Sequence, residues 1–170
     1  MYLILSMKKI TTHLFAIIAL LLVLLIPSKA FAQPTVPSSS VATSAQTTSS
    51  VSLTWTSGNG TYRIVTCTPY GSSVALPVNG TNYVSSATFG LGTSLGSSNY
   101  CVYDGTGSSV TVSGLTAGSR YTFRIFEYTS VVSFESYLTS SYPIYSEYAL
   151  ATAPTTQVSS LNFSSVSTSS

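Results

Sequence analysis

Apolar and polar residues alternate most regularly between residues 109 and 128. The sequence there, SVTVSGLTAGSRYTFRIFEY, contains two alternating halves separated by the corner GLTAG. Alternation with a period of two, bounded by glycines, is typical of half-buried strands. The stretch therefore predicts strands at about 109–113 and 120–128 that meet at a sharp corner. The residues expected to face the core here are Leu115, Tyr121, Phe123 and Ile125. Arg120 and Arg124 are expected to face outward.

The same pattern predicts further strands at about 51–56, 61–68, 99–103 and 145–151. Trp55, in the first of them, is the largest side chain expected in the core. About seven short strands with glycine turns and no helix indicate an antiparallel β-sandwich.

Two segments carry no clear alternation. Residues 33–50 are rich in proline, serine and threonine, which suits a linker or an edge strand. Residues 69–98 are rich in loop-forming residues, with a short extended piece at 82–84 that suits a sheet edge. Loops of this length in a compact domain are often functional.

The first 32 residues have the layout of a secretory signal peptide. Two lysines precede an apolar run of 13 residues at 14–26, and Ala30-Phe31-Ala32 supplies a small-x-small cleavage site. The apolar run is shorter than the roughly 20 residues that a membrane-spanning helix needs. We therefore expect an apolar signal helix rather than a membrane anchor, and cleavage that leaves Gln33 as the N-terminus. The predicted product is secreted or held at the cell surface, without stable membrane insertion.

Cleavage removes all three lysines and the only histidine, His13. The formal charge of the precursor is +2, whereas the mature chain keeps three arginines and four carboxylates and has a formal charge of −1. That balance gives no basic surface for nucleic acid or anionic lipid. The recurring tyrosine, phenylalanine and valine favour a folded, β-rich extracellular domain over a disordered chain.

Two cysteines, Cys67 and Cys101, lie in the exported part. An even number in an exported chain favours a disulfide, which would stabilise the domain by roughly 3 to 4 kcal/mol on the chain-entropy model. The bridge requires the two strands to be neighbours and the two side chains to share a face. The alternative is a pair of free, buried, small hydrophobic residues. The spacing and the absence of histidine after cleavage exclude a CxxC redox motif and a metal site.

The tail at 154–170, PTTQVSSLNFSSVSTSS, resembles residues 34–50, PTVPSSSVATSAQTTSS. Eight of the 17 positions are identical at a constant offset of 120, without a gap. A bias toward serine and threonine explains some matches but not the pairing of Pro34 with Pro154. We expect one domain at 33–153, followed at 154–170 by the start of a second, truncated copy, as in arrays of domains.

Trp55 on its strand and the corner GLTAGSRYTFRI at 114–125 resemble a fibronectin type III domain. The resemblance implies that Leu115 plugs one end of the sandwich, that Gly118 relieves the turn, and that Tyr121 buries its ring and bonds its hydroxyl to nearby backbone. More narrowly, TSGNGTYRIV, the stretch from NYCVYDGTG onward and the APTTQ joint are similar to tandem fibronectin type III repeats of large secreted Bacteroidetes proteins. Those repeats carry apolar residues where this chain has its two cysteines, a double departure that favours the disulfide.

The mature chain lacks the residues of the common nucleophilic systems. A Ser-His-Asp system needs histidine, and serine–lysine chemistry needs lysine. The carboxylates are scattered, and we expect solvated surface charges rather than a glycosidase pair. They are Asp104, Glu127, Glu135 and Glu147. We therefore expect no catalytic residues, no metal and no cofactor, and hence no enzyme.

Aromatic residues around the last loop and strand are the only site-like feature. Exposed tyrosines stack on sugar rings or on peptides, although alternate tyrosines on a strand often simply face the core, which we favour. The candidate ligand-facing residues are Phe134, Tyr137, Tyr142 and Tyr145.

The favoured hypothesis is a noncatalytic fibronectin type III module of an exported multidomain bacterial protein, acting as a spacer or an adhesion unit. One alternative is a carbohydrate- or protein-binding module that uses residues 69–98 and the tyrosines. Another is an accessory domain of a secreted hydrolase whose catalytic domain lies beyond Ser170. The expected partners are further domains of the same polypeptide, and an extracellular protein or polysaccharide, but no nucleic acid.

Overall fold

The structure is a computed structural model that describes residues 32–131 and 134–155. Within this part of the chain there are nine strands and no helix. The strands are β1 (Ser39–Gln46), β2 (Val51–Thr56), β3 (Tyr62–Pro69), β4 (Ser94–Gly96), β5 (Asn99–Gly105), β6 (Ser109–Val112), β7 (Arg120–Val131), β8 (Phe134–Tyr137) and β9 (Ile144–Tyr148). The predicted signal peptide and the predicted second copy lie outside the described residues, except for Ala32 and the first positions after residue 153. Among the described residues, no helix is long and apolar enough to span a membrane.

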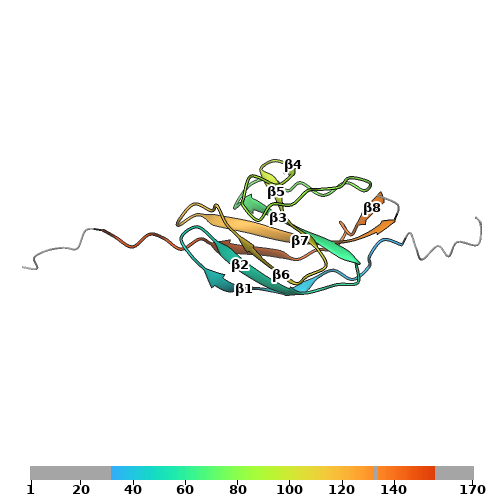
Figure 1. Ribbon diagram of the computed structural model, residues 1–170, viewed down its shortest axis with the longest axis horizontal. Helices are drawn as coiled ribbons and strands as arrows, with labels where there is room; N and C mark the ends of the chain where they lie inside the picture. The colour runs from blue at the N-terminus through green and yellow to red at the C-terminus, as the bar shows by residue number, and fades with distance from the viewer. Residues whose placement is uncertain (1–31, 132–133, 156–170) are drawn as a thin grey trace, which may run out of the picture.

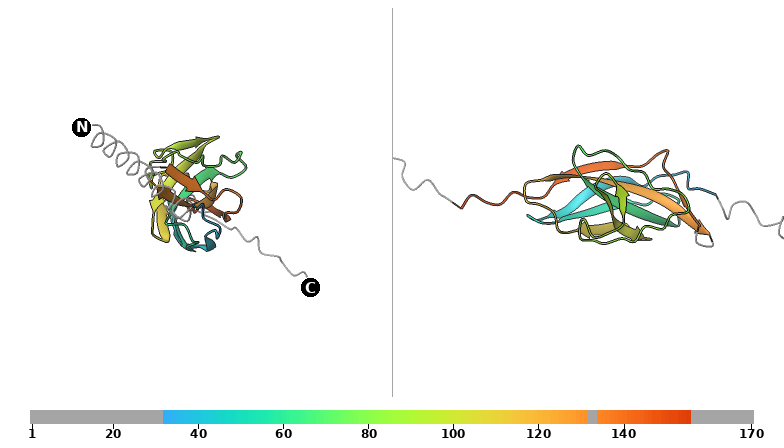
Figure 2. Two further views of the ribbon diagram at one scale, coloured as in Figure 1. Left: turned by 90° about the vertical axis from the view of Figure 1, so that its right-hand side faces the viewer. Right: turned by 90° about the horizontal axis from the view of Figure 1, so that it is seen from above.

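The strands form two antiparallel sheets packed face to face (Figure 1). One sheet has the order β1-β2-β6, and the other has the order β4-β5-β3-β7-β8, with β9 also paired to β7. The all-β antiparallel sandwich expected from the sequence is therefore confirmed. The chain enters at one end of the long axis and leaves at the other, as Figures 1 and 2 show.

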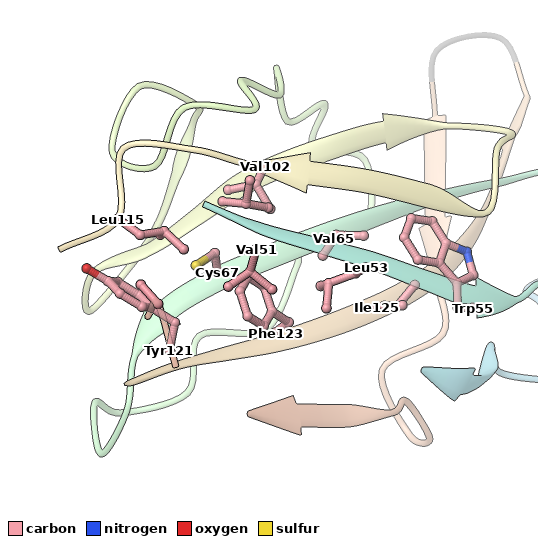
Figure 3. Packing of buried hydrophobic residues seen from close by; sticks show 12 residues of the cluster. Val51, Leu53, Trp55, Val65, Cys67, Val102, Leu115, Tyr121, Phe123 and Ile125 are labelled. Atoms are coloured by element: carbon pink, nitrogen blue, oxygen red, sulfur yellow. The ribbon is translucent and has the colours of Figure 1, made fainter. Parts of the chain in front are cut away.

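The main core lies between the two sheets and is filled by alternate residues of β2, β3 and β7 (Figure 3). Trp55 packs edge-on against Tyr103, with ring centroids 5.5 Å apart. The buried members of this cluster are Val51, Leu53, Trp55, Val65, Cys67, Val102, Val112, Leu115, Tyr121, Phe123, Ile125 and Ala149.

The corner before β7 is closed by the hydroxyl of Tyr121. The Thr116 N–H donates to this hydroxyl at 3.1 Å, while the tyrosine ring is buried in the main core. Gly118 has a φ of +71°, which a residue with a side chain rarely adopts, and its N–H donates to the Ala149 carbonyl at 3.1 Å. A hydrogen bond of this kind contributes about 1 kcal/mol to stability.

Part of the segment 70–98 covers the outer face of the second sheet as an additional layer (Figure 1), whereas Phe89 packs against the main core and its N–H donates to the Ser113 carbonyl at 2.9 Å. Tyr83 is buried against Ile64 and Phe126 in a second apolar cluster, and its hydroxyl accepts a hydrogen bond from the Val78 N–H at 3.0 Å. Only β4 is a strand here, so residues 82–84 do not form the expected edge piece. The layer forms because β3 and β7 also place apolar residues, such as Ile64 and Phe126, on the outer face, and these need cover.

The strand after the corner is longer than predicted. β7 continues to Val131 and pairs with β8, so that residues 129–131 and 134–137 belong to a protruding hairpin, although the pattern predicted no strand between 128 and 145. The last strand is shorter and ends at Tyr148, and residues 39–46 form an edge strand.

The structure contradicts the predicted Cys67–Cys101 disulfide, since both cysteines are free and buried. Val65 lies opposite Tyr103, but a bulge shifts the register by one residue, and Thr66 then lies opposite Cys101. A shift of one residue turns a side chain to the other face of the sheet. Cys67 therefore points into the main core, as Figure 3 shows, whereas Cys101 belongs to the outer cluster beside Tyr83.

We predict two free thiols that are protected by folding. Burial raises the pKa of both thiols, to about 12 for Cys101, so little thiolate exists at neutral pH. Unreduced protein unfolded in guanidinium should take up two equivalents of a maleimide, and native protein should react far more slowly. A single bridged species, 2 Da lighter and inert to maleimide when unfolded, would contradict the register seen here.

Candidate functional site

The four candidate ligand-facing aromatics do not form a common surface. Tyr137 is buried, and its hydroxyl donates to the Thr81 carbonyl at 2.9 Å. Tyr142 packs on Phe126 with ring centroids 4.5 Å apart, on the outer face of the sheet. Tyr145 instead packs against the main core.

Phe134 is the member of this group that is exposed, with 56% of its surface accessible. Its ring covers Gly80, where an added Cβ would lie 3.0 Å from the ring. It lines a shallow hollow on the hairpin together with Thr129, Val131 and Ser136. One exposed ring cannot form the tyrosine platform that the sequence suggested.

The expectation that all carboxylates are solvated is wrong for Glu127 and Glu135, which are 1% and 6% exposed. The Glu127 side chain is fully buried at one end of the main core. Its carboxylate accepts hydrogen bonds from the Gly58 N–H at 2.9 Å, the Gly60 N–H at 3.1 Å and the Ser38 hydroxyl. Arg63 donates to it from Nε at 3.1 Å and from Nη2 at 3.4 Å. The buried negative charge is thus matched by a cation and surrounded by donors.

Arg63 extends the same network to the turn between β5 and β6. Its Nη1 donates to the Gly107 carbonyl at 2.8 Å and also to the Thr106 carbonyl. The pair therefore ties together the chain entrance at Ser38, the turn at 57–61, strands β3 and β7, and the turn at 106–107. This arrangement is structural, because the side chains of Arg63 and Glu127 are only 4% and 0% exposed and bond groups of the domain itself.

The sequence did contain a signal for this pair. Glu127 continues the period of two set by Tyr121, Phe123 and Ile125, which all face the main core. Arg63 lies directly opposite Glu127 in the β3–β7 register. The phase of the alternation therefore predicts that both charged side chains face the core, although charged residues generally prefer the surface.

A second charged group, formed by Tyr70, Arg120 and Tyr148, lies on the outer face near the end where the chain leaves. The Arg120 guanidinium carbon is 4.0 Å from the centroid of the Tyr70 ring and 5.5 Å from that of Tyr148. The tyrosine rings are 58% and 51% exposed. We call this group the Tyr70–Arg120–Tyr148 cluster. The alternation along the strand predicted that Arg120 faces outward, but it gave no sign that the two tyrosine rings lie beside it.

Arg124 shares the outer face of β7 with Arg120, but it is covered and only 6% exposed. Its Nη1 donates to the Asn99 amide oxygen at 3.4 Å, and burial lowers its pKa. Directly opposite is Thr66, whose hydroxyl has no hydrogen-bond partner among the described residues. Arg124 therefore points away from the main core, as expected, yet it is not solvated.

The described residues contain no group of three or more histidine, cysteine or acidic residues arranged to hold a metal ion. Glu147 bonds the Tyr145 hydroxyl and the Tyr148 N–H, and these contacts lower its pKa, so it is held as a carboxylate. Asp104 accepts from the Tyr128 hydroxyl at 2.7 Å. These carboxylates hold neighbouring side chains and do not face each other as a pair.

We predict that Glu127→Gln lowers the free energy of unfolding by about 3 to 5 kcal/mol, because it leaves the Arg63 guanidinium buried without its counter-charge. Urea unfolding followed by fluorescence of Trp55 measures the change. Glu147→Gln is the control and should cost only about 1 kcal/mol, since that carboxylate is partly exposed and has no ion pair among the described residues. Equal costs for the two variants would contradict the structural role of the buried pair.

No protein-family model matches the chain, and no curated protein does. Among solved structures, the chain is similar to the fn3 domain of human collagen alpha-1(XX) chain, with 16% identity, a TM-score of 0.46, and coverage of 74% of this chain and 93% of that one. It is also similar to the fibronectin type-III domain of human fibronectin type III domain containing protein 3, with 16% identity, a TM-score of 0.43 and coverage of 74% and 95%. A computationally redesigned β-sandwich protein has 12% identity, a TM-score of 0.43 and coverage of 74% and 97%.

Proposed function

We propose that this chain is exported and that its domain is a noncatalytic fibronectin type III module, serving as a spacer in a multidomain polypeptide. The corner residues and Trp55 carry the family resemblance, and the two-sheet antiparallel topology agrees with it. The observation that best supports the spacer role is that the chain is hydrogen-bonded to the domain both where it enters and where it leaves, at opposite ends of the sandwich. The sequence repeat at an offset of 120, which covers residues 154–170, supports a second copy after the first.

The chain entrance lies along the protruding hairpin. The Thr129 hydroxyl donates to the Ala32 carbonyl at 3.0 Å, a contact that cleavage after Ala32 would remove from the first copy but not from later ones. The Gln33 side chain donates to the Tyr137 carbonyl. Asn59 also accepts from the N–H groups of Thr35 and Val36, at 3.0 and 2.9 Å. The segment before β1 is therefore fixed to its own domain.

The chain exit is held equally closely. The Ala149 N–H donates to the Ser119 carbonyl at 3.0 Å, and the Leu150 N–H donates to the Thr47 carbonyl at 2.9 Å. At an offset of 120, Ala32 corresponds to Thr152. In an array, Leu150 would be anchored to one copy and Thr152 to the hairpin of the next, with only Ala151 between them. Two residues span at most about 7 Å, so consecutive copies would meet end to end with little freedom.

Export rests on the signal-peptide pattern, and its test is direct. The full chain, expressed in a bacterial host, should appear outside the cytoplasm with Gln33 as its first residue, as measured by intact mass and N-terminal peptide analysis. Ala30→Arg with Ala32→Arg should block cleavage, because the small residues at the cleavage site are lost. Retention of the unmodified protein in the cytoplasm with residues 1–32 intact would reject export.

The spacer role predicts a stiff rod. A polypeptide with residues 33–153 followed directly by residues 34–155 should give, in small-angle X-ray scattering, a maximum dimension near twice that of residues 33–155. Insertion of Gly-Ser-Gly-Ser after Ala151 should broaden the distance distribution, because flexible linkers sample many orientations. If the two-copy polypeptides with and without the insertion give the same distance distribution, the short joint does not restrict the copies and the spacer proposal fails.

A further inference from the structure

We propose that the Tyr70–Arg120–Tyr148 cluster binds the carboxylate of an acidic sugar unit in a polysaccharide. This inference does not depend on the spacer role, since it concerns the outer face of one domain. It goes beyond the spacer role because it assigns a class of ligand to the domain.

The cluster is built on rigid elements. Arg120 lies opposite Tyr148 in the β7–β9 register, and the Tyr70 N–H donates to the Arg120 carbonyl at 2.9 Å. The guanidinium carbon is 4.0 Å from one ring centroid and 5.5 Å from the other. The guanidinium is thus within cation–π distance of both rings, while more than half of each tyrosine is exposed. A site held in this way loses little side-chain freedom when a ligand binds.

The charge of Arg120 is not compensated within the described residues. The single ion pair there is that of Arg63 with Glu127, and Arg63 also donates to backbone carbonyls. The Nε of Arg120 is buried without a hydrogen-bond partner among the described residues. A guanidinium in this state favours a planar carboxylate, which accepts two parallel N–H bonds.

The surroundings add to the attraction for an anion. Arg124 lies on the same face of β7, is nine-tenths buried, and donates to a neutral amide rather than to a carboxylate. Its Nε also has no partner in the described part of the chain. Between the two arginines, Thr122 faces outward and bonds the hydroxyl of Ser146 at 2.9 Å. Arg124 therefore places a second positive charge just beneath the surface near Arg120, although the mature chain has a net negative charge.

The geometry favours a sugar over a peptide. An extended peptide binds most simply by adding its backbone to free backbone groups at a strand edge, but at the end of β9 beside the cluster two of these groups are already used. The Gln46 amide donates to the Tyr148 carbonyl at 3.2 Å, and the Leu150 N–H is used by Thr47. What the cluster leaves open is the outer surface of two aromatic rings, on which the apolar face of a sugar ring can pack.

The test uses the mature chain, residues 33–170, and tetragalacturonate as the probe, with its fully methyl-esterified form as the uncharged match. Isothermal titration calorimetry should show binding of the acid and binding about tenfold weaker or absent for the ester, as expected for loss of a charge-assisted contact. Arg120→Gln should cause a similar loss, and Arg120→Lys a smaller one because the planar fork is gone. Tyr148→Ala should weaken binding several-fold through loss of ring contact. Phe134→Ala removes an exposed ring at the other end of the domain and should change nothing.

Thermal unfolding of each variant shows whether it is folded, and titration of the unmodified chain by NMR gives a readout that needs no variant. The tyrosine ring signals of Tyr70 and Tyr148 should shift with the acid and not with the ester. The proposal is overturned if acid and ester bind alike, if folded Arg120→Gln binds the acid as the parent does, or if no tetragalacturonate binding is measurable. Equal binding of tetraglutamate would overturn the assignment to a sugar and favour an acidic peptide.

Discussion

The carboxylate of Glu127 is the group on which the N-terminal end of the domain depends. A buried charge is costly unless it is paired and hydrogen-bonded, and here the donors come from segments far apart in the sequence. Ser38, the turn at 57–61 and Arg63 all meet on it. The network fixes where the chain enters, because Ser38 cannot leave without exposing an acceptor to a dry interior. The direction of the preceding segment, and thus the alignment of any preceding module, follows from this one charge.

The glycines beside this carboxylate show why the turn has its sequence. Asn-Gly predicts a turn from backbone conformation alone, yet the closer reason is space. A Cβ on Gly60 would lie 2.7 Å from a Glu127 oxygen, and one on Gly58 would lie 2.1 Å from the Val36 carbonyl oxygen. Both glycines let a backbone N–H reach the carboxylate at hydrogen-bond distance. The two glycines therefore allow the turn to bond the carboxylate, and these hydrogen bonds fix the conformation of the turn.

The sequence predicted best what depends on local pattern. The strands around the corner follow from alternation, and the sandwich follows from their number. The position of Cys101 could not be predicted, because one bulge turns it to the opposite face from Cys67 and no local signal marks that bulge. The outer layer was missed for a related reason, since Tyr83 is buried by contacts with distant strands and not by any period of its own. Glu127 was in phase with the core, and only the general preference of charges for water argued against it.

Strand β7 divides the charges of the domain into two kinds. On its inner face, Glu127 and Arg63 satisfy each other and hold the fold together. On its outer face, Arg120 and Arg124 lack carboxylate partners among the described residues, although four carboxylates are available in the mature chain. Folding alone gives no reason to hold guanidinium groups there, because an apolar residue would cover the sheet at lower cost. A bound anion would supply the negative charge that the outer face lacks. Such an anion has access at Arg120, which lies between two exposed tyrosines.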